Sequence, residues 1–357
     1  MKTKWILWIL CSVYTFSAQA QTFTEQKTFH RSFATTPNTE ISINNKYGNI
    51  VLVPSETDSV IFDIDVSVTD KHDYEALEQL DEIGIDFIAA GYIINAITSF
   101  DGNRNDFKTD WKMFAGSVFS SSKIVKVNYL VAVPAEVSVV IENSYGNVLM
   151  GNHSGAFKLL LSGGDFTAGV LEGKTTINMS GGNMNCRYLA DALVNIDMTE
   201  VFIDSIANVY FDSRASQITI QKAKKLTIDS RRDKWFMNEI EQLGGSGSFS
   251  SFSVNTLQTD CNLKTFYGNL TFQRVADSFK NISLIASYTD VTIGMPTAAQ
   301  PAFQCEMKKT RSLFPATLNL KTDTLDAKAG MFRCYNSVEN SSSTMNMNLT
   351  GGSISVF

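Results

Sequence analysis

A short corner motif recurs along this chain and limits what the chain can fold into. At three places an alternating strand pattern enters a Tyr-Gly-Asn triplet and leaves it as a new apolar strand: Tyr47-Gly48-Asn49, Tyr145-Gly146-Asn147 and Tyr267-Gly268-Asn269. A Ser-Gly-Gly version follows the second copy, first at Gly163-Gly164 and then, 18 residues later, at Gly181-Gly182. A corner that returns at a short interval is typical of a solenoid, in which each coil stacks on the one before it.

The apolar runs around these corners predict the shape of one coil. A coil of roughly 18 residues, at about 3.3 Å per residue, has a contour near 60 Å, which suits a flattened tube of two or three short strands. We expect Gly and Asn at the corners to supply positive φ angles, and stacked Asn and Ser side chains to bond along the axis. Inward side chains would form columns, with five apolar residues predicted to lie in register: Phe166, Met184, Ile203, Ile218 and Trp235.

The prediction is therefore an all-β fold, a parallel β-helix whose coils fill residues 136–357 and continue from a β-rich part at 21–135. One helix is predicted in that part, over residues 72–83, capped by Asp70 or Asp73 and stopped by Gly84. We expect it to cover an end or flank of the sheet, with a docking helix as the alternative. Its predicted apolar stripe comprises Tyr74, Leu77, Leu80 and Ile83. The Gly- and Ser-rich stretch at 241–251 reads as a loosened turn.

The start of the chain predicts export. Met1-Lys2-Thr3-Lys4 is followed by an apolar run at 5–16 and by Ser17-Ala18-Gln19-Ala20, which together indicate a secretory signal peptide at 1–20, cleaved after Ala20. The run is shorter than the roughly 20 apolar residues that span a bilayer. We expect a periplasmic, cell-surface or secreted protein with no membrane span after cleavage.

Charge and cysteine content exclude some functions. The formal net charge is -6, and without a basic block the chain is not expected to bind nucleic acid. Four cysteines follow the predicted signal, and none is spaced for a zinc site. Buried unpaired thiols are favoured, while export leaves a disulfide between Cys305 and Cys334 open. The four are Cys186, Cys261, Cys305 and Cys334.

No metal or cofactor site is predicted from the remaining polar residues. The three histidines have no partner at the spacing of a helical zinc site, and His153 is expected to be solvated in its turn. Residues 101–106 begin like a calcium loop, but Lys112 stands where a Glu should close the site. Residues 231–234, Arg-Arg-Asp-Lys, resemble part of a lyase site, although a solvated charged turn is favoured.

The loop at 99–122 is the least regular part of the chain. It is long, polar and carries two aromatic residues, Trp111 and Phe114. Long loops in compact proteins are often functional, so these two residues are predicted as a contact surface.

The order of motifs is similar to that of a known bacterial family. Asn45-Lys46-Tyr47-Gly48-Asn49, a helix before a strand, Tyr-x-Val-x-Val-Pro at 129–134, and Asn143-Ser144-Tyr145-Gly146-Asn147 resemble the exported putative adhesins, envelope proteins with a β-helical domain of unknown function. The resemblance covers most of the chain after residue 20. It implies a right-handed parallel β-helix outside the cytoplasm, and it brings no catalytic motif.

Together these features predict a non-catalytic exported envelope protein, an adhesin or a binding or structural β-helix. The partner is left unknown, with an envelope or extracellular glycan or protein as the candidates. The alternative is a polysaccharide-active β-helix enzyme, a lyase or hydrolase, which would need carboxylates from several coils in one groove.

Overall fold

The computed structural model describes residues 22–100, 124–296, 299–338 and 341–357. The predicted signal peptide, the contact residues Trp111 and Phe114 and the calcium-like loop lie outside these ranges. The described residues form 23 strands, one α-helix and one 3-10 helix, so the fold is all-β apart from two short helices. By residue numbers the chain divides into two compact units, the first with 1–28, 65–84 and 99–126, and the second with 29–64, 85–98 and 127–357.

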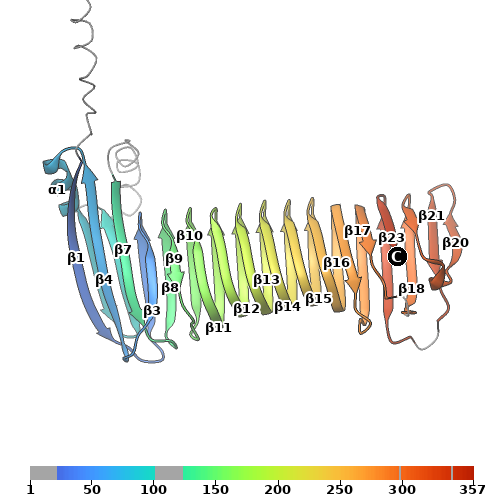
Figure 1. Ribbon diagram of the computed structural model, residues 1–357, viewed down its shortest axis with the longest axis horizontal. Helices are drawn as coiled ribbons and strands as arrows, with labels where there is room; N and C mark the ends of the chain where they lie inside the picture. Colours follow the sequence, from blue (N-terminus) through green and yellow to red (C-terminus); the bar gives the residue numbers. More distant parts are fainter. Residues whose placement is uncertain (1–21, 101–123, 297–298, 339–340) are drawn as a thin grey trace, which may run out of the picture. The chain divides into compact units, whose positions relative to one another are not determined.

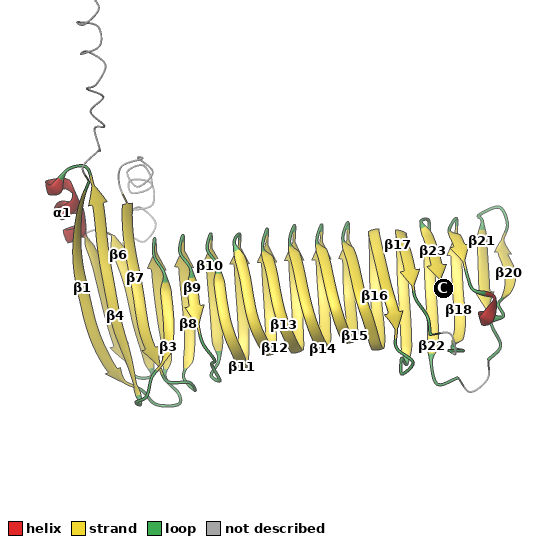
Figure 2. Cartoon of the chain, in the orientation of Figure 1, coloured by secondary structure: helices red, strands yellow, loops and turns green. Residues whose placement is uncertain are grey.

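The strands are coloured by position in Figure 1 and distinguished from helices and loops in Figure 2. In chain order they are β1 (Phe23–Ala34), β2 (Glu40–Lys46), β3 (Ile50–Pro54), β4 (Ser59–Asp70), β5 (Ile83–Ala90), β6 (Ile93–Phe100), β7 (Ile124–Val133), β8 (Ser138–Ser144), β9 (Val148–Met150), β10 (Phe157–Ser162), β11 (Phe166–Ser180), β12 (Asn183–Asp197), β13 (Glu200–Arg214), β14 (Gln217–Arg231), β15 (Lys234–Ser248), β16 (Ser251–Val275), β17 (Asn281–Ile293), β18 (Ala302–Lys308), β19 (Arg311–Leu313), β20 (Lys321–Asp326), β21 (Met331–Tyr335), β22 (Thr344–Thr350) and β23 (Ser353–Val356). The 3-10 helix η1 covers Ala316–Leu318.

The helix α1 (Asp73–Glu82) belongs to the first unit and lies within the predicted range. Its buried residues are Ala76 and Leu80, whereas Tyr74 and Leu77 are 74% and 48% exposed. The predicted stripe was therefore wrong in half of its members. The small residue Ala76 turns inward, and this rotates the buried face of the helix away from the two larger side chains.

The ends of α1 also differ from the prediction. His72 is the N-cap and makes no side-chain cap bond. The Asp70 carboxylate instead accepts hydrogen bonds from the backbone N–H groups of Lys71 and His72, before the helix begins. The helix stops at an extended Ile83, and Gly84 lies inside β5 rather than at the stop.

Strands of the second unit pair in parallel to form a long sheet, as Figure 1 shows from β8 to β17. Phe157 on β10 lies opposite Val139 on β8 and opposite Thr175 on β11, so the chain returns to the same position after 18 residues. Between β12, β13, β14 and β15 the return takes 17 residues. We call each such stretch a row, and neighbouring rows lie about 4.8 Å apart.

The rows keep an almost constant length, and this corrects the predicted register. Ser180 pairs with Asp197, and Asp197 pairs with Arg214. The inward column that begins with Phe166 and Met184 therefore continues with Val201, not with Ile203. It goes on through Ile218 to Trp235, and all five side chains are at most 1% exposed. Burying each large apolar side chain is worth about 1.5–3 kcal/mol, so these columns supply much of the stability.

Most of the Gly- and Ser-rich stretch is strand, and only Phe249 and Ser250 form a turn. Residues 244–248 belong to β15 and pair with β14 on one side and β16 on the other. At Gly247 an added Cβ would stand 2.4 Å from the Phe252 ring. The small residues therefore leave room for the side chain of the following row.

The last rows do not follow chain order. β22 pairs with β17 on one side and with β18 on the other, so residues 344–350 lie between rows that precede them in the sequence. β18 also pairs antiparallel with β21, which pairs with β20. All six residues of β20 are exposed, and they include Lys321 and two aspartates, the kind of charged edge that discourages pairing with another chain.

Candidate functional site

Each row turns at a residue whose φ angle is positive, and these corner residues form one column along the second unit. Backbone bonds link them in order: the N–H of Tyr145 donates to Ser162, that of Gly163 to Ser180 and that of Gly181 to Asp197. We call this set the corner column. Its members are Tyr47, Tyr145, Gly163, Gly181, Met198, Ala215, Arg232, Phe249, Tyr267, Tyr288, Gly351 and Lys309.

In the Tyr-Gly-Asn triplets the positive φ belongs to the tyrosine, not to the glycine or asparagine as predicted. It is 62° at Tyr47, 59° at Tyr145 and 53° at Tyr267. A left-handed conformation costs a residue with a side chain about 1–2 kcal/mol. The rows on either side hold each corner by backbone hydrogen bonds, which offset that cost.

The glycine of each triplet is needed for a different reason, which is close approach between rows. An added Cβ at Gly146 would stand 1.9 Å from the carbonyl oxygen of Gly48. The same position is Gly164 and Gly182 in the next two rows, with Cβ distances of 2.2 and 2.0 Å to the preceding carbonyl oxygen. Gly268 would stand 2.0 Å from the Ser250 oxygen. There is no space for a side chain in any of these four places.

The asparagine of the triplet bonds along the rows, as the sequence predicts for stacked Asn side chains. Asn49 Oδ1 accepts the backbone N–H of Asn147 at 2.9 Å, and Asn147 Oδ1 accepts that of Asp165 at 2.9 Å. Asp165 Oδ1 then accepts the N–H of Asn183 at the same distance. The four rows that carry Asn49, Asn147, Asp165 and Asn183 are thereby tied together by side chains at their corners.

Aromatic corner residues stack on one another. The rings of Tyr47 and Tyr145 lie 5.7 Å apart with an interplanar angle of 9°. Further along, Tyr267 stacks on Phe249 at 5.2 Å and on Tyr288 at 5.0 Å. These rings remain between 40% and 55% exposed at the three positions of the second stack.

An open groove of about 590 Å³ runs over the outer side of β8 and β10 to β13. Its polar floor includes Asn178 and Asn195, and Asn195 Nδ2 donates to Asn178 Oδ1 at 2.8 Å. At its margin the Asp197 carboxylate accepts hydrogen bonds from Arg214, which holds the pKa of Asp197 below its ordinary value. The remaining lining residues are Glu142, Asn143, Ser144, Leu160, Leu161, Ser162, Met179, Ser180, Ile196 and Asp212.

The groove meets the corner column where its side chains are smallest. Ser162 and Ser180 line the groove and directly precede Gly163 and Gly181. An added Cβ at Gly163 would lie 3.4 Å from the Tyr145 ring, whereas at Gly181 nothing lies within 4 Å. The groove therefore opens over the corner at Gly181, with an aromatic ring close by.

The charged turn at 231–234 is only partly solvated, in contrast to the prediction. Arg231, Arg232 and Lys234 are exposed, but Asp233 is 2% exposed. Its carboxylate accepts hydrogen bonds from the hydroxyls of Ser213 and Ser230 at 2.7 and 2.6 Å. It also accepts the backbone N–H groups of Ser216 and Arg231. Asp233 thus holds neighbouring rows together, and it is not available to a ligand.

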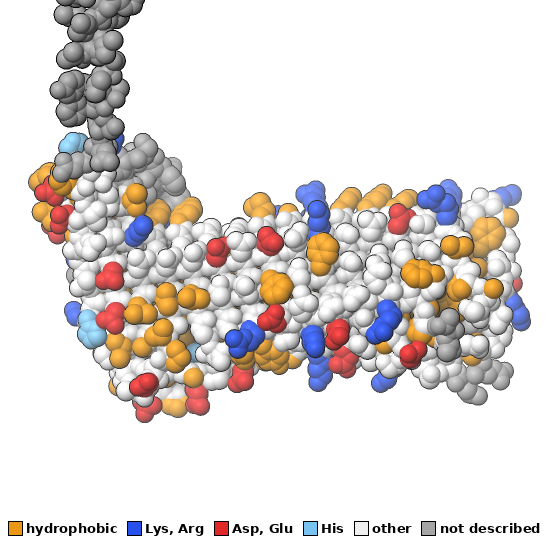
Figure 3. All heavy atoms as spheres, in the orientation of Figure 1, with side chains coloured by type: hydrophobic (Ala, Val, Ile, Leu, Met, Phe, Trp, Pro, Cys, Tyr) orange, Lys and Arg blue, Asp and Glu red, His pale blue; other side chains and the backbone are white. Residues whose placement is uncertain are grey.

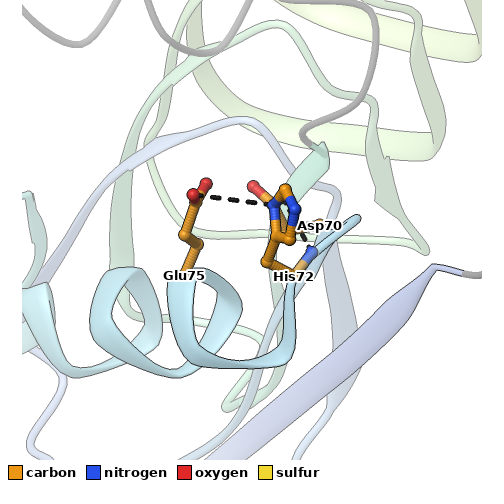
Figure 4. Close-up of side chains that lie close together, drawn as sticks. All are labelled: Asp70, His72 and Glu75. Carbon is orange, nitrogen blue, oxygen red and sulfur yellow. Dashed lines mark hydrogen bonds and ion pairs between the residues drawn. The ribbon is translucent and has the colours of Figure 1, made fainter.

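One group of side chains has the makeup of a metal site. Asp70, His72 and Glu75 offer ligand atoms within 4.8 Å of one another, and Figure 4 shows these side chains close together at the start of α1. His72 Nδ1 lies 3.6 Å from Glu75 Oε1 and 4.0 Å from Asp70 Oδ1. Asp70 Oδ1 already accepts hydrogen bonds from two backbone N–H groups. The position of these three side chains is therefore explained by the structure at the start of α1, without a metal ion.

His153 is buried rather than solvated, which corrects the prediction for this turn. It is 6% exposed, and its Nε2 lies 3.0 Å from the Val137 carbonyl oxygen. Burial lowers the pKa of the imidazole, more than the hydrogen bond to Val137 raises it. The ring is therefore a neutral member of the core.

All four described cysteines are buried and carry free thiols. Cys305 and Cys334 lie directly opposite each other on the antiparallel strands β18 and β21. Burial raises the pKa of Cys305 to about 12, with smaller contributions from Cys334 and Glu306. The Cys305 thiol is therefore a poor nucleophile at neutral pH.

Within the part of the chain that the structure describes, no helix is long and apolar enough to cross a membrane. No protein-family model matches the sequence, and no curated protein matches it.

Several solved structures resemble this chain at low identity. A putative cell adhesion protein from Clostridium sporogenes is 9% identical, with a TM-score of 0.18, over 93% of this chain and 99% of that one. A putative adhesin from Parabacteroides distasonis is 10% identical, with a TM-score of 0.33, over 93% and 97%. A putative lipid binding protein from the same species is 11% identical, with a TM-score of 0.28, over 92% and 96%. At these scores the function has to be argued from the chain's own residues.

Proposed function

We propose that this chain is a non-catalytic, exported envelope protein that binds a polymer or another protein through the outer side of its second unit. The observation that carries the proposal is the groove over β8 and β10 to β13, which is lined by apolar side chains and by asparagine, serine and carboxylate side chains, and which is bordered by the corner column. Amide, hydroxyl and carboxylate groups repeat there at the spacing of the rows. A surface of this kind suits an extended ligand with a regular repeat.

The scaffold that we infer is a right-handed parallel β-helix. Three features support it: the 17- to 18-residue return, parallel pairing of successive rows, and apolar residues that recur at the same inward position. Parallel strands of one sheet are joined by right-handed connections in about 98% of cases, which favours that hand. The signal peptide at 1–20 stays a prediction, and with it export to the periplasm, the cell surface or the medium.

Binding without catalysis is favoured by the state of the carboxylates in the groove. A glycoside hydrolase needs a general acid, a carboxyl group whose pKa burial has raised. Glu142 and Asp212 are exposed, while Asp197 is paired with Arg214, which lowers its pKa. None of the three has the environment of a general acid. The lyase alternative rests on Arg231 and Arg232. The carboxylate beside them, that of Asp233, already accepts hydrogen bonds from residues of neighbouring rows.

The test is retention of the purified protein on a panel of peptidoglycan, neutral and acidic glycans and matrix proteins. We expect at least one member to be bound, and Asn178→Arg and Asn195→Arg, which place bulk in the groove, to weaken that binding. Asn185→Arg is the matched control, because Asn185 is exposed on β12 but lies outside the groove. If no panel member is retained, the binding function is wrong. Release of shortened products from a bound glycan would establish the enzymatic alternative instead.

A further inference from the structure

Two rows of the second unit carry the same pattern of cations at their corners. One row reads Arg231-Arg232-Asp233-Lys234 and the other Lys308-Lys309-Thr310-Arg311. Arg232 and Lys309 are the corner residues, with φ angles of 63° and 53°. In both rows a cation therefore stands before the corner, at the corner and two residues after it. All six side chains are exposed.

The register places these two basic corners in line. Arg231 pairs with Ser248, Ser248 with Phe266 and Phe266 with Ser287. Ser287 pairs with Thr350, and Thr350 pairs with Lys308. Five row steps separate Arg231 from Lys308, which is roughly 24 Å at the usual spacing between strands.

The rows between the basic corners carry an aromatic strip, which we define as Phe249, Phe266, Tyr267 and Tyr288. The Phe266 ring stands edge-on to Tyr267 at 4.4 Å, and it contacts the other two rings in the same way at 6.5 and 6.3 Å. The strip is thus a packed unit, although each of its rings is at least 40% exposed. Figure 3 shows hydrophobic side chains along the upper edge of this region, with Lys and Arg side chains on either side.

The six cations are available to an anionic ligand. None of them forms an ion pair with a carboxylate of the described residues. By contrast, the nearby Arg214 and Arg333 are both engaged in pairs. The chain as a whole carries a net charge of -6. Two groups of three unpaired cations are therefore a local feature and do not reflect a basic composition.

The chemistry beside the strip identifies the kind of polymer. Two residues after each corner stand Asn269, Asp290 and Ser353, which are polar and at least partly exposed. Insertion into a membrane would bury these groups, and that is costly. The faces of the three stacked rings are turned toward one another, so they offer little to a nucleic acid base. The phenol hydroxyls of Tyr267 and Tyr288 make no hydrogen bond to any described residue, and they can bond to sugar hydroxyls.

We propose that an acidic polysaccharide of the uronate type lies along the aromatic strip, with its carboxylates on the basic corners at 231–234 and 308–311. This inference rests on the proposed binding function and adds to it a second surface, separate from the groove, with a stated ligand class. Arginine and lysine attract the carboxylates. The strip contributes contacts with sugar rings and hydrogen bonds from its phenols. The two corners act together only on a polymer long enough to reach both, and such a polymer gains affinity from bivalent attachment.

Polygalacturonate is the probe, and its methyl ester is the control, because the ester keeps the sugar rings and loses the charge. We expect the purified protein to bind polygalacturonate, to bind the ester at least about tenfold more weakly and to lose affinity as salt is added. The variants R231E/R232E and K308E/K309E should each weaken binding by about tenfold or more. Lys158→Glu is the matched control, since Lys158 is an exposed lysine on β10, outside both corners.

Oligomer length gives a second measurement. Affinity should rise with the length of oligogalacturonates until they span roughly 24 Å. In R231E/R232E that dependence should disappear, because only one basic corner remains. Tyr267→Phe and Tyr288→Phe keep the stack and remove the hydroxyls, and they should lower affinity. Phe236→Ala, an exposed phenylalanine outside the strip, should not.

Several results would overturn the inference. Equal binding of the methyl ester, or unchanged binding by both charge-reversed variants, excludes the basic corners. Capture of anionic vesicles or single-stranded DNA in place of polygalacturonate, lost in the same variants, would assign the region to that ligand. If the protein retains only a neutral glycan or a protein, the proposed binding function still holds, but an acidic polysaccharide is excluded as the ligand. A thermal unfolding transition shows whether each variant is folded. If a variant of a ring residue is not folded, the variants of the exposed charged residues still test the inference.

Discussion

The carbonyl oxygen of Gly48 occupies the place where a side chain on Gly146 would begin. An added Cβ would stand only 1.9 Å from that oxygen and 2.5 Å from the Gly48 carbon. The obstacle is backbone of the neighbouring row, which cannot rotate aside as a side chain would. The two rows that meet here therefore depend on glycine at this position, whereas in later rows the same position is held by Thr199, Ser216 and Asp233.

Gly146→Ala should destabilise the protein by about 3 kcal/mol or more, because the methyl group forces two paired rows apart. Gly151→Ala is the matched control, since an added Cβ there meets nothing within 4 Å. Urea unfolding followed by circular dichroism measures both. Equal stability of the two variants would show that the corner can open, and loss of ligand binding with unchanged stability would make Gly146 a binding residue.

Ala215→Gly should stabilise the protein by about 0.5–1 kcal/mol. Ala215 is an exposed corner residue with a φ angle of 51°, and relief of its left-handed strain is worth about 1–2 kcal/mol. The greater freedom of glycine in the unfolded chain takes back about 0.5–1 kcal/mol. Thermal unfolding at one pH measures the difference. A lower melting temperature would contradict this prediction, because it would mean that the Ala215 methyl group stabilises the fold by packing even though the residue is exposed.

The stability of the protein should fall as the pH drops below the ordinary pKa of histidine, near 6.5, because of His153. Burial lowers the pKa of His153 in the folded protein, so the unfolded chain takes up the proton first. The contribution is present in full above that ordinary pKa and is lost as the pH falls toward the lowered value. His153→Gln should flatten this part of the pH profile in urea unfolding. An unaltered slope in His153→Gln would contradict the assignment.

Cys305 and Cys334 should form a disulfide when the folded protein is kept with oxidised glutathione. Opposite residues of an antiparallel pair have Cα atoms about 4.5–5.5 Å apart, within the range of disulfides. One thiolate attacks glutathione disulfide and releases glutathione, and the second thiol then displaces another glutathione from the mixed disulfide. The reaction should be slow near pH 7, since burial raises the pKa of Cys305, and faster at higher pH.

Peptide mapping and thiol titration follow this oxidation. Two of the four described thiols should disappear while Cys186 and Cys261 remain. The cross-link should stabilise the protein by about 3 kcal/mol. Cys305→Ser should abolish the reaction. Persistence of all four thiols in the folded wild type, with oxidation only after unfolding, would contradict it.

The regular part of the fold could be predicted because each row repeats the same local chemistry. Alternation of apolar and polar residues specifies the strands, and the recurrence of Gly163-Gly164 at Gly181-Gly182 specifies the row length. The register failed after Ser180, because the predicted column placed Ile203 opposite Met184 in place of Val201, and this offset also sets Thr199 rather than Asp197 opposite Ser180. Serine and threonine occur both before the corner and just inside it, so identity alone cannot tell the two positions apart.

The corner residues show a similar limit. Sequence patterns assign positive φ to Gly or Asn, yet here backbone bonds on both sides hold Tyr, Met, Ala and Arg in that conformation. Residues 231–234 were singled out from the sequence, but their alignment with 308–311 was missed because Arg231 and Lys308 are 77 positions apart in the chain. Only the insertion of β22 between β17 and β18 reveals how many rows separate them.

That insertion also orders events during synthesis. Residues 302–313 leave the ribosome before residues 344–356, although the later stretch lies between them and β17. Thr344 bonds to Asn281 across 63 residues, against 17 or 18 in the regular rows. The edge of β17 therefore stays unpaired until β22 has been synthesised, and pairing between such distant segments is slow. Until then this edge can pair with a strand of another protein chain. A nascent chain paused at this point would be the form most in need of a chaperone.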